Sequence, residues 1–316
     1  MRLPIGMAWR RILPFMHRIP ERIGFAELEG VRRQHAEWQQ QASRDFARHR
    51  TAEALAANDD NGAVRFSKTQ DMAKFMLVRD YLKDMESRGA EASRLAMAHR
   101  RADVKSLNEQ IREARKKNGE LADEIAFQTT EGKRAFAKAD RLSFIENSRA
   151  LDVKNGTLGT IEAVEEGRIV VRLDGQGREE GRAVSVPTGE YAALEHGYAV
   201  TVHKAQGATV DRSFVLASAT MNRHLSYVSL TRLRHAAQLY AGRDDFKDMA
   251  ALSVRLGRAN AKETTFDYAE RRGLAEMTAA EYSRRDIRPE ASAEQTRGRG
   301  AEGRGTDRGR NASLEL

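Results

Sequence analysis

The sequence of 316 residues contains no cysteine, and this absence excludes both a disulfide framework and thiolate metal sites. Its eight histidines form no H-x-H or H-E-x-x-H pair, so the pattern predicts no histidine-based metal site either. No apolar run approaches the roughly 20 residues that a membrane-spanning helix needs. These absences predict a metal-free, cytoplasmic protein without a membrane span.

A phosphate loop is absent as well. No G-x-x-x-x-G-K-[S/T] pattern occurs in the 316 residues, and no Asp-Glu pair ends an apolar strand, where it could hold magnesium. The sequence therefore contains no complete site for ATP and Mg²⁺.

Positive charge is in excess. A formal net charge of +8 and an isoelectric point near 9.7 favour an acidic polymer as partner. Because 32% of the residues are charged, much of this charge is also ordinary solvated surface. The composition thus predicts nucleic acid as a partner class without identifying a site.

The hydrophobic pattern alternates between helix and strand. Residues 27–57 and 68–88 have helical periodicity, 94–99 is a short buried strand, and a further helix begins at Asp103. This alternation predicts an α/β fold with a parallel sheet. Between 137 and 190 short strands are separated by N-G, E-G and D-G turns, which is typical of a small β-barrel.

Polar and charged residues crowd against two short apolar runs. The first run, Tyr198 to Val202, predicts a buried strand followed by His203, Lys204, Gln206 and Gly207. The second, Leu225 to Leu230, also predicts a strand, with Thr231 and Arg232 at its end. Ligands of open α/β sheets bind outside the carboxyl ends of strands, so we expect phosphate or nucleic acid there. A solvated strand end is the simpler alternative for either group alone.

These motifs resemble a helicase family. T-V-H-K-A-Q-G at 201–207 and S-Y-V-S-L-T-R-L-R at 226–234 resemble motifs V and VI of superfamily I DNA helicases, in the RecD-like, UvrD-like C-terminal branch of TraA-type conjugative relaxase/helicases. L-E-G-V-R-R-Q at 28–34 resembles motif IV, and 136–147 with 153–161 resembles the segment between motifs. The resemblance covers roughly residues 20–275. It implies a RecA-like P-loop NTPase second domain with an inserted SH3-type barrel.

The resemblance implies a role for each matching residue. Arg33 of motif IV and Arg232 of motif VI would be catalytic arginine fingers that stabilise charge on the γ-phosphate of ATP. Gln34, Gly207 and Thr209 would contact the nucleotide, although the family often has Glu at the position of Thr209. Thr201, His203, Lys204 and Gln206 would bind single-stranded DNA. A further departure is Ala139-Asp140, where the family usually has Gly-Asp.

The implied organisation has five parts. Residues 25–136 and 191–245 would form the discontinuous RecA-like domain, 137–190 the inserted barrel, and 246–282 a helical extension. Residues 1–24, with five arginines and three prolines, form an irregular basic leader. Residues 283–316, with eight arginines, six acids and no aromatic residue, are expected to be disordered.

Two functions remain open from the sequence. The chain is expected to be the C-terminal half of an ATP-dependent helicase of conjugative DNA transfer, with ATP and Mg²⁺ bound only together with a first RecA-like domain. A separately encoded N-terminal relaxase/helicase part would then be its partner. Alternatively, it is a non-catalytic DNA-binding or interaction module, or a truncated helicase fragment. In either case we expect the isolated chain not to hydrolyse ATP.

Overall fold

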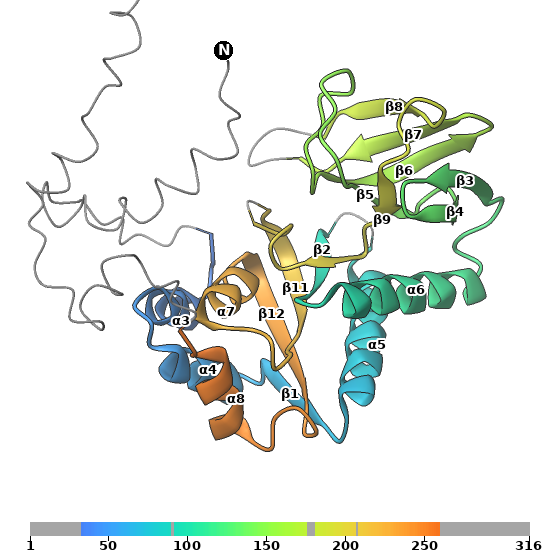
Figure 1. Ribbon diagram of the computed structural model, residues 1–316. Coiled ribbons are helices and arrows are strands. Elements are labelled where there is room, and N and C mark those ends of the chain that lie inside the picture. Colours follow the sequence, from blue (N-terminus) through green and yellow to red (C-terminus); the bar gives the residue numbers. More distant parts are fainter. Residues whose placement is uncertain (1–32, 90–91, 176–180, 207, 260–316) are drawn as a thin grey trace, which may run out of the picture. The chain divides into compact units, whose positions relative to one another are not determined.

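The computed structural model in Figure 1 describes residues 33–89, 92–175, 181–206 and 208–259. All of them belong to one compact unit, Gly24–Asn260. The predicted leader at 1–24, the tail at 283–316, the part of the helical extension beyond 259 and Gly207 lie outside the described residues.

The described chain forms helices and strands in an alternating order. The helices are α3 (Glu37–Ala47), α4 (Thr51–Asp60), α5 (Gln70–Arg88), α6 (Arg101–Lys117), α7 (Arg223–Leu230) and α8 (Met249–Leu256). The strands are β1 (Val64–Ser67), β2 (Arg94–Ala98), β3 (Ile125–Thr129), β4 (Gly132–Phe136), β5 (Arg141–Phe144), β6 (Leu158–Glu165), β7 (Arg168–Leu173), β8 (Ala183–Pro187), β9 (Leu194–His196), β10 (Ala199–Thr201), β11 (Val210–Leu216) and β12 (Leu233–Gly242).

A parallel sheet of five strands, in the order β1-β12-β11-β2-β10, forms the centre of the unit. All four neighbouring pairs run parallel, so the predicted α/β class with a parallel sheet is confirmed. Successive residues of a strand face opposite sides of a sheet. In β2, Leu95 and Met97 accordingly pack in one apolar core, and Ala96 and Ala98 pack in another.

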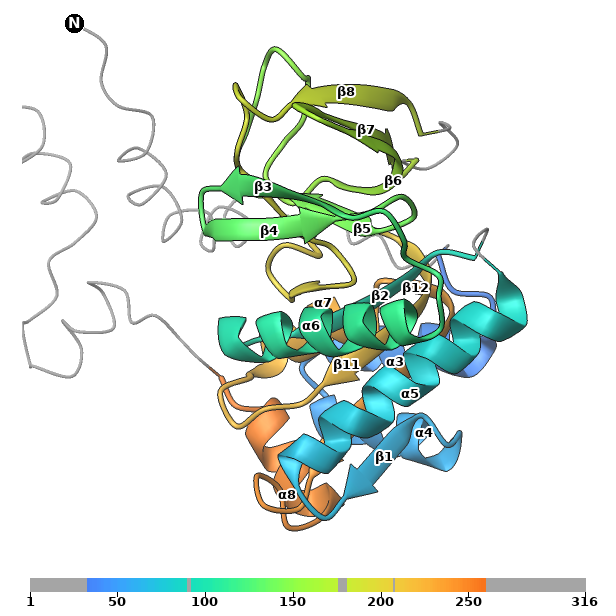
Figure 2. The same cartoon turned by 90° about the vertical axis from the view of Figure 1, so that its right-hand side faces the viewer.

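Helices cover both faces of this sheet (Figures 1 and 2). Helices α5 and α6 pack on the face that carries Ala96 and Ala98, and α3, α4, α7 and α8 lie on the opposite face. Helix α5 begins at Gln70, two residues after the predicted start, because the Thr69 side chain caps it by accepting a hydrogen bond from the Met72 amide at 3.2 Å. None of the helices in the described part of the chain combines the length and apolarity needed to cross a bilayer.

A second, antiparallel sheet with the order β8-β7-β6-β5-β9 interrupts the α/β pattern between α6 and β10. Its apolar core includes Phe144, Ile169 and Val186, and the hairpin β3–β4 adds Phe127 and Phe136 to this core. We call residues 125–196 the insert. Among the described residues no strand ladder joins β8 to β9, so an SH3-type barrel stays a prediction.

Two predicted elements differ from the structure. The predicted strand at Leu225 to Leu230 is wrong, because this segment is helix α7. The Asn222 side chain caps it by accepting bonds from the His224 and Leu225 amides, each at 3.1 Å. The interspersed serines suit a helix, since the Ser226 hydroxyl donates to the Asn222 carbonyl four residues earlier.

The helical segment expected at 27–57 is two helices within its described part. Helix α3 ends at Ala47 and α4 begins at Thr51. His49 between them has a φ of 63°, a left-handed conformation that a helix cannot contain. The apolar spacing alone did not indicate this break.

Candidate functional site

The turn after β10 carries most of the residues predicted to bind DNA. We call residues 202–206 the motif V turn. Strand β10 ends at Thr201, whose carbonyl accepts a hydrogen bond from the Ala205 amide at 3.1 Å. Val202 and Ala205 are buried, while His203 and Gln206 are exposed and Lys204 is half-buried. The buried residues hold the turn on the sheet and leave three polar side chains at its surface.

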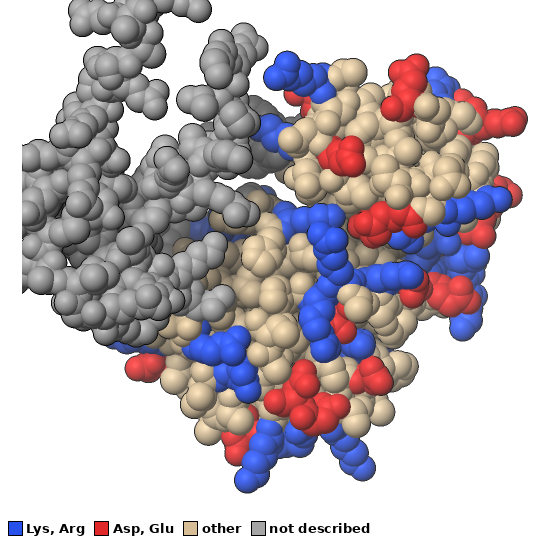
Figure 3. Space-filling model, in the orientation of Figure 1, with Lys and Arg blue, Asp and Glu red and all other residues tan. Residues whose placement is uncertain are grey.

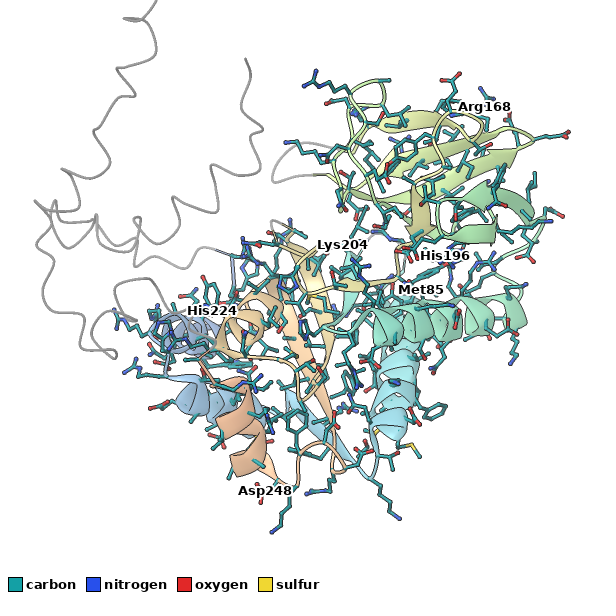
Figure 4. The ribbon with its side chains drawn as sticks, in the orientation of Figure 1. Met85, Arg168, His196, Lys204, His224 and Asp248 are labelled. Atoms are coloured by element: carbon teal, nitrogen blue, oxygen red, sulfur yellow. The ribbon has the colours of Figure 1, made fainter. Side chains whose placement is uncertain are left out.

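The motif V turn lies against the insert. The Lys204 ammonium is 3.8 Å from the Glu195 carboxylate of β9, on the side of the sheet that faces the insert in Figure 4. Gly156 approaches the turn so closely that a Cβ at its position would lie 3.3 Å from the Lys204 carbonyl oxygen. On the other side, the His203 ring lies 5.7 Å from the His99 ring, between centroids. The insert therefore contacts the turn through Gly156 and Glu195.

Arg232 lies at the amino end of β12, beside the amino end of β11. It follows α7 and immediately precedes β12, and its carbonyl accepts a hydrogen bond from the Val210 amide at 3.0 Å. The expectation that Arg232 follows the carboxyl end of a strand is wrong, because residues 225–230 are helical. Residues 202–209 instead carry the chain from the carboxyl end of β10 to the amino end of β11, beside Arg232.

The two predicted arginine fingers are brought together. Arg33 Nη1 donates to the carbonyl oxygen of Thr231 at 3.1 Å, although the two residues are 198 positions apart. Burial, followed by the neighbouring charge of Arg232, lowers the pKa of Arg33. The Nε atom of Arg232 is buried and has no hydrogen-bond partner among the residues that the structure describes. Within the described residues, neither guanidinium forms an ion pair with a carboxylate.

Asp211, which follows Val210 in β11, is paired with another arginine. Arg234 Nη1 lies 3.0 Å from Asp211 Oδ1. The other carboxylate oxygen, Oδ2, accepts bonds from the Ser93 amide and hydroxyl, both at 2.9 Å. These contacts lower the pKa of the Asp211 carboxyl despite its partial burial. Arg33 and Arg232 thus form a cationic pair near the amino ends of β11 and β12. Such a pair can attract an anion.

The remaining predicted nucleotide contacts have different surroundings. Gln34 is buried, and its Oε1 accepts a hydrogen bond from the Ser43 hydroxyl at 2.7 Å. Thr209 is half-buried and lies in the segment that leads into β11 beside Arg232. Gly207 lies outside the described residues. The nucleotide contacts of Gln34, Gly207 and Thr209 stay predictions.

A buried polar network ties the insert to the sheet. Asp140, which directly precedes β5 of the insert, is fully buried and accepts a hydrogen bond from the Tyr198 hydroxyl at 2.5 Å. Arg112 of α6 donates to both oxygens of the same carboxylate at 3.1–3.2 Å. Arg115 donates to Tyr198 Oη at 2.9 Å. Tyr198 directly precedes β10, so the network connects the insert, α6 and the strand that leads to the motif V turn.

The chemistry of these side chains limits what they could hold. In the part of the chain that is described, no group of three or more His, Asp or Glu side chains could hold a metal ion. Arginine donors suit phosphate oxygens, because a guanidinium offers a planar fork of N–H groups. These residues therefore fit the phosphate of a nucleotide and offer no magnesium ligand set. Their roles in nucleotide and DNA binding stay predictions.

Comparisons with known proteins agree with the helicase resemblance, although no family model matches the chain. The chain is 39% identical over 293 residues to the conjugal transfer protein TraA of Agrobacterium fabrum, an alignment that covers 89% of this chain and 26% of TraA. It is 31% identical over 115 residues to the ATP-dependent DNA helicase Pif1 of Bdellovibrio bacteriovorus, covering 32% of this chain and 25% of Pif1.

A solved structure is similar too. Bacteroides Pif1 bound to ssDNA is 16% identical, covers 78% of this chain and 56% of that chain, and has a TM-score of 0.45. The chain spans about a quarter of the length of the TraA protein that it matches. The chain is similar over most of its length to TraA conjugal transfer proteins, and over 115 residues to a Pif1 helicase.

Proposed function

We propose that the chain is the C-terminal part of an ATP-dependent DNA helicase of conjugative DNA transfer. It binds single-stranded DNA through the motif V turn and directs Arg33 and Arg232 at the γ-phosphate of ATP. ATP and Mg²⁺ are held by a phosphate-loop domain outside these 316 residues, either in a longer chain or in a separately encoded relaxase/helicase part. Identity of 39% to a TraA protein over most of this chain supports the assignment.

The pair formed by Arg33 and Arg232 carries this proposal. Two guanidinium groups held near each other repel, and partial burial increases the cost of keeping both charged. An anion that binds both groups offsets this cost. A nucleotide phosphate fits, because a fixed arginine stabilises the charge that develops during phosphoryl transfer.

The motif V turn supports the DNA-binding half of the proposal. His203, Lys204 and Gln206 present polar side chains at the surface, while buried Val202 and Ala205 fix the backbone. The Glu195 carboxylate lies 3.8 Å from the Lys204 ammonium, which is a long distance for an ion pair. A DNA phosphate can therefore compete for the ammonium. From this surface the chain continues to the amino end of β11, beside Arg232. This connection would couple DNA binding at the turn to nucleotide binding at Arg232.

The test is the affinity for fluorescein-labelled single-stranded DNA, measured by anisotropy across a salt series. Wild type should bind with an affinity that falls steeply with salt. Lys204→Ala should bind more weakly, with the slope of log K against log[salt] reduced by about 0.7, because the lysine no longer neutralises one phosphate. Lys105→Ala, which removes an exposed lysine of α6, is the matched control and should behave as wild type. Equal affinities for wild type and Lys204→Ala would remove Lys204 from the DNA site.

The absence of a phosphate loop from these residues favours a second candidate, a non-catalytic DNA-binding module or a truncated helicase fragment. Both candidates predict DNA binding, and both predict no ATP turnover by the isolated chain. They differ once a phosphate-loop part of a TraA relative is supplied. Turnover that depends on Arg232 then supports the helicase, and the lack of any stimulation supports the module.

A further inference from the structure

A groove of about 600 Å³ lies beside α5, on the sheet face opposite to α7. One wall is the C-terminal half of α5, residues 79–88, and the other is formed by β1, β11 and β12. Its volume is within the range of about 300–1,000 Å³ that is usual for ligand sites. Five basic side chains line it: Arg79, Lys83 and Arg88 from α5, Arg65 from β1 and Arg212 from β11.

Only two carboxylates line the same groove, and each is shared between several arginines. Asp84, whose side chain is 6% exposed, lies 3.3 Å from Arg88 Nε, 3.1 Å from Arg94 Nε and 3.2 Å from Arg212 Nε. One buried negative charge thus holds three guanidinium groups. A carboxylate has room for few such partners at good geometry. Accordingly, the buried Arg212 Nε forms no hydrogen bond within the described part of the chain.

Asp80 is shared in the same way. It lies 3.0 Å from Arg65 and 2.8 Å from Arg79, and it also accepts a hydrogen bond from the Tyr240 hydroxyl at 2.9 Å. Lys83 has no ion-pair partner among the described residues. With five cations and two acids, the lining carries a formal charge of 5 − 2 = +3. The two carboxylates fix the arginines in place and leave most of their charge uncompensated.

We propose that this groove is a second anion site that binds backbone phosphates of single-stranded DNA. The proposal rests on the proposed function, because it assumes that the chain binds such DNA. Arg79 and Arg88 are nine residues apart on α5, which is about 13.5 Å along the helix axis. Successive phosphates of one B-form strand rise by about 3.4 Å along the helix axis. An extended single strand spaces them more widely, so a wall of this length can still face more than one phosphate.

The charge of the groove suits a polyanion, and the proposed binding of single-stranded DNA favours nucleic acid over an acidic peptide as its occupant. Guanidinium groups on both walls suit phosphate oxygens, which accept two parallel N–H bonds. Figure 3 shows Lys and Arg side chains gathered in a band over the middle of the visible face, near β11 in Figure 1. The aromatic residues of the lining, Phe214 and Tyr240, are buried and cannot stack on a base. The site would therefore bind backbone phosphates independently of the base sequence.

The experiment compares two double variants in the same anisotropy salt series. Arg79→Ala/Lys83→Ala removes two cations of the groove. Lys105→Ala/Lys117→Ala removes two exposed cations of α6, whose side chains are 63% and 75% exposed, and matches the change in net charge. For the groove variant we expect the slope of log K against log[salt] to fall by about 1.4, because two phosphates are no longer neutralised. The control should keep the wild-type slope.

Three outcomes would overturn the proposal. The first is a groove variant with the wild-type slope, and the second is an equal loss in the control. The third is a groove variant that binds single-stranded DNA normally but has lost affinity for poly-glutamate, because the occupant is then an acidic peptide. If wild type itself does not bind single-stranded DNA, the proposed function fails as well. If Lys204→Ala weakens binding and the groove variant does not, the groove assignment alone fails.

Discussion

The guanidinium of Arg33 donates a hydrogen bond to the main-chain carbonyl of Thr231 at 3.1 Å, and this contact places the motif IV arginine beside Arg232. Because the acceptor is a backbone atom, the contact fixes the position of Arg33 without neutralising its charge. Asp211, the acid in this region, is bound to Arg234. The arrangement keeps two cations together at the cost of mutual repulsion, which is expected where an anion completes a site.

Removal of Arg33 should therefore not destabilise the fold. Arg33→Met loses one hydrogen bond but relieves repulsion with Arg232, so we expect the free energy of unfolding to stay equal or to rise by up to about 1 kcal/mol. Arg234→Met breaks the ion pair with Asp211 and should lower it by about 0.5–1 kcal/mol. Urea denaturation of both variants measures this. A loss in Arg33→Met as large as that in Arg234→Met would show that Arg33 is structural.

Gly156 tests whether the insert positions the motif V turn. Gly156→Ala introduces a methyl group 3.3 Å from the Lys204 carbonyl oxygen at a φ of +91°. Gly167→Ala is the matched control, because its φ is +79° and no atom lies within 4 Å of the new methyl. Both should lose about 1 kcal/mol of stability from backbone strain. Only Gly156→Ala should also weaken binding of single-stranded DNA, and an equal affinity in the two variants would contradict support of the turn by the insert.

Asp140 tests the buried network between the insert and the sheet. Asp140→Asn leaves the buried guanidinium of Arg112 with a neutral partner at this position. We expect the free energy of unfolding to fall by about 3–5 kcal/mol. Asp174→Asn removes an exposed partner of Arg141 and should cost at most about 1 kcal/mol. Thermal and urea unfolding measure both. Similar small losses would mean that the network contributes little to holding the insert.

Much of the α/β core was predictable from the sequence. Helix α5 follows from the helical spacing of its apolar residues, and strands β2 and β10 follow from short apolar runs that are buried on both faces. The prediction of a strand at 225–230 failed for a local reason. The run from Leu225 to Leu230 alternates apolar residues with serines and fits either element, and the Asn222 cap decided for a helix. The break at His49 depends on a left-handed backbone conformation that no glycine or proline marks.

The site residues were predicted mainly from a resemblance, and the structure adds relationships that no local pattern contains. The contact between Arg33 and Thr231 spans 198 positions, so it depends on the fold as a whole. The pairing of Asp211 with Arg234 likewise joins two strands through sheet register. Asp140 stood out only as part of an altered Gly-Asp pair, and its role as a buried acceptor for Arg112 and Tyr198 required the structure.

The most direct test is ATP turnover when this chain is combined with the phosphate-loop part of a TraA relative, in one chain or as separate proteins. Turnover should be stimulated by single-stranded DNA and should fall about 10³–10⁵-fold in Arg232→Ala, the range for loss of an arginine finger. Arg168→Ala, at an exposed arginine of the insert paired with Glu165, is the control and should keep full turnover. Full turnover by Arg232→Ala would contradict the assignment of Arg232 as an arginine finger.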